Sequence, residues 1–192
     1  MGRVLLSMSV SLDGFSAGPD VGVERPMGEG GERLHEWMFH GNADQGVNAE
    51  AVRDLLATTG ATVVGRRMFD VGVGLWQDTP YPLPCVVLTH EPREDRVEKS
   101  GTFIFVTGVE DALRRAREAA GGKDVLVMGG AHTARQFVRA GLVDEIRLQL
   151  VPVLLGAGTR LFDHLDTGRI ELERTGLAGS PQVTHLCFRV VR

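Results

Sequence analysis

The feature that most constrains this fold is the segment at residues 124–128, which reads DVLVM. Its four consecutive apolar residues are bounded by Gly121-Gly122 before and Gly129-Gly130 after. A short apolar run between such breaks is typical of a strand that is covered on both faces. Strands of this kind belong to parallel sheets, whose crossover connections place helices on both sides. The sequence therefore favours an α/β fold with a mostly parallel sheet.

Hydrophobic periodicity predicts that strands and helices alternate along most of the chain. We expect strands at residues 3–12, 61–64, 85–88, 103–106, 124–128, 143–153, 170–177 and 183–191. We expect helices at residues 32–40, 46–59, 109–120 and 132–140, and a further helix that starts after Gly65. The last two strands are separated only by a turn, so we expect them to be antiparallel at one edge of the sheet. No linker or repeat interrupts the pattern, which predicts a single domain over residues 1–192.

Charge and cysteine content narrow the class of protein. The net charge of −4, with both signs mixed along the chain, argues against a nucleic-acid surface, which needs clustered Lys and Arg. No apolar run reaches the roughly 18–20 residues that span a bilayer, and we interpret residues 3–12 as a strand rather than a signal peptide. Cys85 and Cys187 lie in apolar segments, which favours free buried thiols in the reducing cytoplasm. No Cys/His spacing indicates a metal site.

Two strand ends run through glycine directly into a helix. Gly65 is followed by Arg66 and Arg67, so a phosphate could approach the backbone, the unpaired helix amides and the guanidinium groups. Gly129-Gly130 precedes the second helix and leaves room for a flat ring or a pyrophosphate. A solvated turn and a tight strand–helix turn are the structural alternatives. Two such junctions in one small domain favour a dinucleotide site that bridges them.

A third strand end carries Thr89 and His90. A hydroxyl and an imidazole at this edge can bind the far end of a dinucleotide, although both also occur in ordinary loops. The Gly-x-Gly-x-x-Gly fingerprint does not occur at these junctions, which disfavours an ordinary Rossmann domain.

These junctions, in this order, resemble the dihydrofolate reductase superfamily, in particular the branch of the C-terminal reductase domain of the riboflavin-pathway deaminase–reductase and its stand-alone relatives. The resemblance covers nearly the whole chain. It rests on Ser11-Leu12-Asp13-Gly14, Val64-Gly65-Arg66, Leu88-Thr89, Met128-Gly129-Gly130, Ala140-Gly141-Leu142-Val143-Asp144-Glu145 and Val151-Pro152-Val153-Leu154-Leu155-Gly156. The last two segments together are the most specific of these marks.

The resemblance implies a three-layer α/β/α fold with an eight-stranded mixed sheet, NADPH across its carboxyl edge, and a homodimer. The cofactor-binding residues that it implies are Val10, Ser16, Ala17, Gly65, Arg66, Arg67, Met68, Thr89, His90, Met128, Gly129, Gly130, Ala131, His132 and Thr133. The implied substrate-binding residues are Asp13, Trp37, Leu154 and Gly156.

The substrate side departs from true dihydrofolate reductases. Those enzymes carry an acidic residue in the first helix that faces the pterin, whereas here residues 35–38 read His-Glu-Trp-Met with Trp37 on the inward face. Asp13 is our candidate for binding or protonating substrate; a turn Asp that caps its own backbone is the alternative. Trp37 either stacks on a flat substrate or serves as a core aromatic. The loop over residues 13–31 either closes over the site or is disordered.

The function that these expectations favour is hydride transfer from NADPH to a C=N or C=O carbon of a small pterin- or pyrimidine-like heterocycle. His40, Asp44 and Asp70 are further polar candidates for the site. The alternatives are an NADP(H)-binding regulator without turnover and a purely structural α/β subunit.

Overall fold

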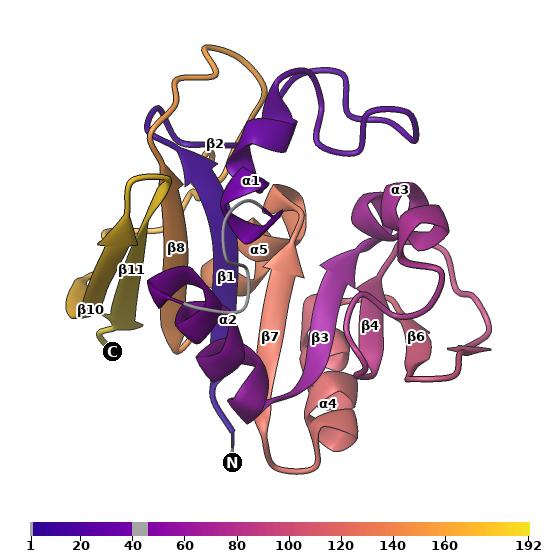
Figure 1. Cartoon of the computed structure of the whole chain (residues 1–192). Coiled ribbons are helices and arrows are strands. Elements are labelled where there is room, and N and C mark those ends of the chain that lie inside the picture. Colours follow the sequence, from indigo (N-terminus) through magenta and orange to yellow (C-terminus); the bar gives the residue numbers. More distant parts are fainter. Residues whose placement is uncertain (1, 40–45) are drawn as a thin grey trace.

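The computed structural model describes residues 2–39 and 46–192 and contains a nine-stranded sheet in the order β10-β11-β8-β1-β7-β3-β4-β6-β5 (Figure 1). Its strands are β1 Val4–Ser11, β3 Thr59–Gly65, β4 Cys85–Leu88, β5 Arg96–Val97, β6 Thr102–Val106, β7 Asp124–Gly129, β8 Glu145–Val151, β10 Leu172–Ser180 and β11 Val183–Val190. The six strands from β8 to β6 are parallel, and the strands at both edges are antiparallel. The mixed, mostly parallel sheet and the antiparallel C-terminal hairpin are as predicted.

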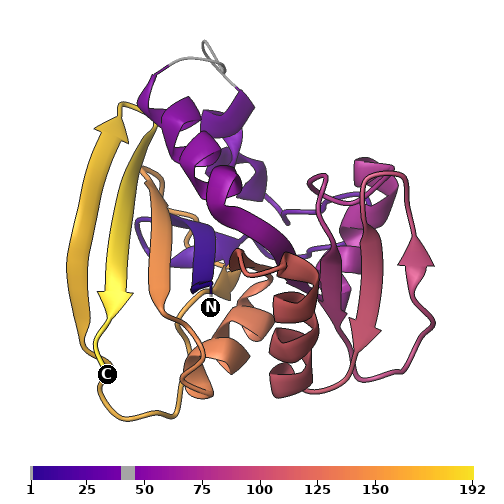
Figure 2. The same cartoon turned by 90° about the horizontal axis from the view of Figure 1, so that it is seen from below.

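Helices cover both faces of this sheet, as Figure 2 shows for α2 on one side and α4 and α5 on the other. The helices are η1 Gly31–Leu34 (3-10), α1 Glu36–Phe39, α2 Val47–Thr58, α3 Arg66–Trp76, α4 Val109–Ala120 and α5 Ala131–Arg139. Helix α4 packs on β3 and β4, and α5 packs on β7. None of the helices in the described part of the chain is long and apolar enough to cross a membrane.

The side-chain alternation of the strands divides the core into parts. Val125 and Val127 of β7 face α4 and α5, within one large apolar cluster. The opposite face has two smaller clusters, one beneath α3 around Phe69 and Phe103 and one beneath η1 and α1 around Trp37. One continuous core therefore does not cover this opposite face. The two clusters lie on either side of the middle of the sheet.

Three details differ from the sequence-based expectation. The sheet has a ninth strand, β5, which the sequence did not predict because its two residues are exposed and carry no apolar pattern. The expected helix at 32–40 is divided into η1 and α1, and His35 lies between them at the end of the 3-10 turn. The loop after β1 also contains a short strand, β2 Phe15–Ala17, which pairs with β9 Thr159–Arg160.

Candidate active site

A cavity of about 1230 Å³ opens between the two smaller core clusters and continues over the carboxyl ends of the central strands. Its floor includes Ser7 and Ser9 of β1 and Leu126 and Met128 of β7. Helices α1 and α2 line one side, and α3 lines another. The start of α5 and residues of the loop after β2 complete the lining. In open α/β sheets, ligands bind at this edge of the strands.

The two predicted strand–glycine–helix junctions are neighbours at this edge. Strands β3 and β7 pair directly, and Val64 lies opposite Gly129. Helix α3 follows Gly65, and α5 follows Gly130; neither helix start receives a side-chain cap. The first amides of both helices are therefore free to bind an anion at one site. A single extended molecule can contact both junctions.

The fit of a dinucleotide is supported by the space around the glycines. A Cβ at position 65 would overlap Thr133 Oγ1, so the two junctions already touch without a side chain between them. A Cβ at position 130 would meet nothing within 4 Å, because this glycine faces the open cavity. The lining thus includes a backbone cradle beside a helix start, which suits a phosphate group.

Most residues that the sequence analysis assigned to the cofactor come together in this cavity. Those that line it are Ser16, Ala17, Gly65, Arg66, Arg67, Met68, Thr89, His90, Met128, Gly130, Ala131, His132 and Thr133. Val10 and Gly129 do not: Val10 is buried in the large core, and a Cβ at 129 would lie 2.7 Å from Met8 Sδ. Trp37 and Asp70 also line the cavity, whereas His40 and Asp44 lie outside the described residues.

The residues that line this cavity belong to a stretch of sequence that matches a known protein family. The sequence profile of the RibD C-terminal domain matches residues 3–185, almost the entire chain. The chain belongs to the RibD C-terminal domain family. The suspected branch of the dihydrofolate-reductase-like superfamily is thereby confirmed.

Two relatives extend the comparison of this RibD C-terminal domain. The protein YwjB of Bacillus subtilis (strain 168) is 26% identical over 189 residues, which is 97% of each chain. The 2,5-diamino-6-ribosylamino-4(3H)-pyrimidinone 5′-phosphate reductase of Aquifex aeolicus (strain VF5) is 36% identical over 81 residues, covering 38% of this chain and 36% of the relative.

Solved structures confirm the dihydrofolate-reductase-like fold. A candidate riboflavin biosynthesis protein from Shewanella sp. PV-4 superposes with a TM-score of 0.75 at 21% identity, covering 99% of each chain. Dihydrofolate reductase from Enterococcus faecalis, complexed with NADP(H) and RAB-propyl, superposes with a TM-score of 0.63 at 14% identity, covering 98% of this chain and 96% of the reductase.

The two arginines of this RibD C-terminal domain at the start of α3 are held in different ways. Arg66 Nε lies 3.1 Å from Asp70 Oδ2, and its Nη1 lies 3.2 Å from Glu91 Oε2. Arg67 Nη2 donates to the Val21 carbonyl at 2.8 Å and so ties α3 to the loop after β2. Both guanidinium groups line the cavity. Arg66 is half-exposed, so exchange of its carboxylate partners for a phosphate costs little desolvation.

Asp13 does not line the cavity, and the structure gives its carboxylate another task. Ser11 Oγ donates to Oδ1 at 2.6 Å, Leu155 N donates to Oδ1 at 3.1 Å, and Gly156 N donates to Oδ2 at 2.8 Å. These bonds, with that from Ser11 first, lower the Asp13 pKa to about 2. Asp13 joins the end of β1 to the glycine-rich loop: the amides that it accepts from are those of Leu155 and Gly156, whereas the turn-capping alternative placed its partners in its own turn. The exposed Leu154, like Gly156, lies outside the cavity lining.

Trp37 both lines the cavity and belongs to the core. Its side chain is 6% exposed, and its Nε1 donates to Ser9 Oγ at 3.2 Å. The ring meets the edge of His185 at a centroid distance of 5.1 Å. Most of the Trp37 side chain is therefore buried in the core, as the core-aromatic alternative predicts, and the remainder faces the cavity.

The sequence analysis missed the polar floor of the site. Ser7, Ser9, Gln149 and His185 line the cavity from β1, β8 and β11. Gln149 Nε2 donates to Ser7 Oγ at 3.1 Å. The available signal was a polar residue at an inward-facing strand position, where an apolar one is expected. Burial lowers the pKa of His185, which favours its neutral form.

The loop after β1 is folded over one end of the cavity. Gly18 N donates to the Met27 carbonyl and Glu29 N donates to the Pro19 carbonyl, so its two limbs run side by side. Val21, Pro26 and Met27 line the cavity. The loop thus contributes a wall in the described conformation, and whether it moves stays a prediction.

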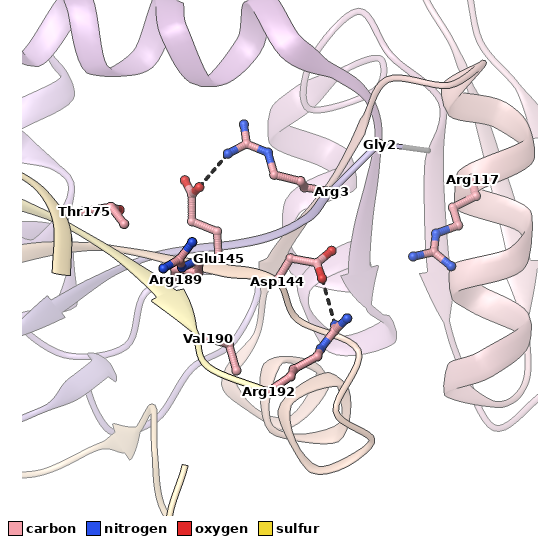
Figure 3. Close-up of a pocket in the computed structure, with 9 residues that line it drawn as sticks. All are labelled: Gly2, Arg3, Arg117, Asp144, Glu145, Thr175, Arg189, Val190 and Arg192. Atoms are coloured by element: carbon pink, nitrogen blue, oxygen red, sulfur yellow. Dashed lines mark hydrogen bonds and ion pairs between the residues drawn. The ribbon is translucent and has the colours of Figure 1, made fainter. Parts of the chain in front are cut away.

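A second cavity, of about 610 Å³, lies at the opposite edge of the sheet (Figure 3). Two ion pairs line it: Arg3 Nη1 lies 2.7 Å from Glu145 Oε2, and Arg192 Nη2 lies 2.7 Å from Asp144 Oδ1. Arg117 reaches it from α4. None of the glycine-led helix starts lies there, so this cavity carries no part of the predicted chemistry.

Proposed function

We propose that this protein is an NADPH-dependent reductase that transfers a hydride to a C=N or C=O carbon of a pyrimidine- or pterin-like heterocycle. The observation that carries the proposal is the junction of β3–α3 and β7–α5 in one cavity, where two uncapped helix starts and two glycines adjoin. The RibD C-terminal domain family and the NADP(H) complex of the similar reductase support this choice of cofactor.

The residues at the two junctions would hold the cofactor phosphates. Gly130 leaves its backbone open to the cavity, Gly65 admits the close approach of Thr133, and Arg66 supplies charged donors. Thr89 and His90, at the end of β4, would contact the adenosine end. Thr133 and His132, at the start of α5, complete the wall. When bound, NADPH supplies the hydride.

The protein itself would provide position and exclude water. The floor formed by β1 and β7 would hold the reacting ring flat, with Trp37 at its side. The loop over Val21 and Met27 would shield the site from solvent. The name of the Aquifex aeolicus relative supports a pyrimidine-like substrate, because it describes the reductase of a diaminopyrimidinone.

Calorimetric titration with NADPH and NADH, followed by loss of NADPH absorbance in the presence of a panel of pterins and aminopyrimidinones, tests the proposal. We expect micromolar or tighter binding of NADPH and oxidation with at least one member of the panel. Absence of NADPH binding would refute the function. Tight binding without oxidation of any compound would instead favour a regulator that senses the cofactor.

A further inference from the structure

Three polar side chains form a row across the floor of the cavity on three adjacent strands. Ser9 of β1 pairs in register with Gln149 of β8, and Gln149 pairs with His185 of β11. Residues paired across neighbouring strands project from the same face of a sheet. All three line the cavity. We call Ser9, Gln149 and His185 the polar row.

Two members of the polar row present free acceptors. Gln149 is held by the bond from its Nε2 to Ser7, and no described residue donates to its Oε1. His185 Nε2 lies 2.9 Å from Asn48 Oδ1, an atom that only accepts, so Nε2 carries the hydrogen. His185 Nδ1 is then an acceptor in the neutral ring, and no described residue donates to it either. The floor therefore offers two fixed, uncharged acceptors to a ligand that carries N–H donors.

The lining that the described residues of α1 and α2 contribute beside this row contains neither Lys nor Arg. Arg66 and Arg67 belong to the start of α3, beside the cofactor junction. Arg135 lies on α5 and donates to the carbonyls of Ala131 and Asp163. Residues 40–45, which follow α1, contain neither Lys nor Arg.

Arg147 lies on β8 two residues before Gln149, and so on the same face of the strand as the polar row. Its Nε donates to Glu145 Oε1 at 2.6 Å. Arg147 does not line the cavity. It therefore has its own partner and does not supply a phosphate contact on this side.

The walls beside the polar row are apolar. Met38 and Phe39 of α1 and Val52 and Leu55 of α2 line one wall, and Leu75 of α3 lines another. Phe39 and Leu75 are 73% and 65% exposed, so they present apolar surface at the cavity instead of burying it in the core. A phosphate placed against such walls would lose water without gaining a charged partner.

We propose that the substrate is an uncharged flat heterocycle without a phosphate, whose amino or ring N–H groups donate to Gln149 and His185. The proposal rests on the reductase function proposed above. It separates this chain from its Aquifex aeolicus relative, whose name specifies a 5′-phosphate on the substrate. Gln149 and His185 are then the residues that determine substrate specificity.

Titration of the protein–NADP⁺ complex with matched ligand pairs tests this. One pair is an aminopyrimidinone nucleoside and its 5′-phosphate, and the other is a hydroxyalkyl pterin and its phosphate ester. We expect the unphosphorylated member of at least one pair to bind at least tenfold more tightly. Gln149→Leu should weaken that binding about tenfold, as expected for one lost hydrogen bond, without changing NADP⁺ affinity. Gln149→Glu keeps an acceptor at this position and should bind within about threefold of wild type.

Gln182→Leu, in the exposed turn between β10 and β11, is the matched control and should bind as wild type. Tighter binding of a phosphorylated member in either pair would overturn the proposal. So would failure of all four ligands to bind, or unchanged binding in Gln149→Leu. NADP⁺ affinity is measured first and separately. If NADP⁺ does not bind, the reductase function is refuted. The ligand pairs can then be titrated without cofactor, and this titration still tests the polar row.

Discussion

Thr133 Oγ1 occupies the space in which a side chain at Gly65 would begin. The hydroxyl belongs to the first turn of α5 and the glycine to the end of β3, so the two strand–glycine–helix junctions are in direct contact. Thr133 is 3% exposed and has little room to turn away. The close approach of the two helix starts therefore depends on the absence of a Cβ at position 65.

Gly65→Ala should lower the free energy of unfolding by about 1–3 kcal/mol, the range for overpacking, and weaken NADPH binding. Adding Thr133→Ala removes the overlapping hydroxyl and should restore part of the stability, which a double-mutant cycle in urea measures. Gly74→Ala is the control, because a Cβ on that exposed residue of α3 meets nothing within 4 Å. Strictly additive losses would mean that the two residues do not interact.

Arg66→Ala should raise the NADPH dissociation constant by roughly 10- to 100-fold, because a hydrogen bond to a charged group contributes about 1.5–3 kcal/mol. The loss should shrink at high salt, since the guanidinium is half-exposed. Arg174→Ala, on the exposed strand β10, removes the same charge away from the cavity and serves as the control. Equal NADPH affinities for wild type and Arg66→Ala in calorimetry would remove Arg66 from the cofactor site.

Gly130→Val should abolish NADPH binding while the protein stays folded. The valine Cβ would meet no protein atom within 4 Å, so its methyl groups would project into the space proposed for the cofactor. Circular dichroism and thermal unfolding check the fold, and calorimetry checks the binding. If the valine variant bound NADPH normally, the glycine pair would be only a turn.

Asp13→Asn should lower the melting temperature at neutral pH, because one amide cannot replace both carboxylate oxygens toward Ser11, Leu155 and Gly156. The folded pKa of Asp13 is about 2, below its ordinary value of 3.8. Its contribution to stability is therefore present above about pH 4 and is lost as the pH falls toward 2.

The difference between wild type and Asp13→Asn should accordingly narrow across that acidic range. Asp54→Asn is the control, because this exposed carboxylate on α2 forms no hydrogen bond or ion pair with the rest of the described chain. Since Asp13 lies outside the cavity, NADPH affinity should change little at neutral pH. A loss of turnover with unchanged stability would return Asp13 to the list of catalytic candidates.

The fold could be predicted largely from local patterns. The apolar run of β7 and the glycines around it mark a central strand, and α4 has the predicted bounds 109–120. Strand β5 could not be predicted, because pairing with β6 through two exposed residues leaves no trace in hydrophobicity. The homodimer implied by the family resemblance stays a prediction that sedimentation can test.

The part of the candidate site at the two glycine junctions could be predicted from the sequence. The part formed by residues on different strands could not, because the pairing register of the strands determines which of them lie side by side. Gly65 and Gly130 are visible because few other residues suit a close backbone approach. Gln149 and His185 each look like one polar residue in a strand, and only the pairing of β8 with β11 brings them together. Asp13 was assigned to the site because it follows β1, but its carboxylate turns to the loop at Gly156 instead.

Because β11 supplies His185 near the end of the chain, one side of the floor cannot form until that strand has added to β8. Both glycine junctions come before β11 in the sequence, and neither includes a residue of that strand. The floor beside His185 therefore depends on the C-terminal hairpin, whereas the contact between the two glycine junctions depends on β3, β7 and the helices that follow them.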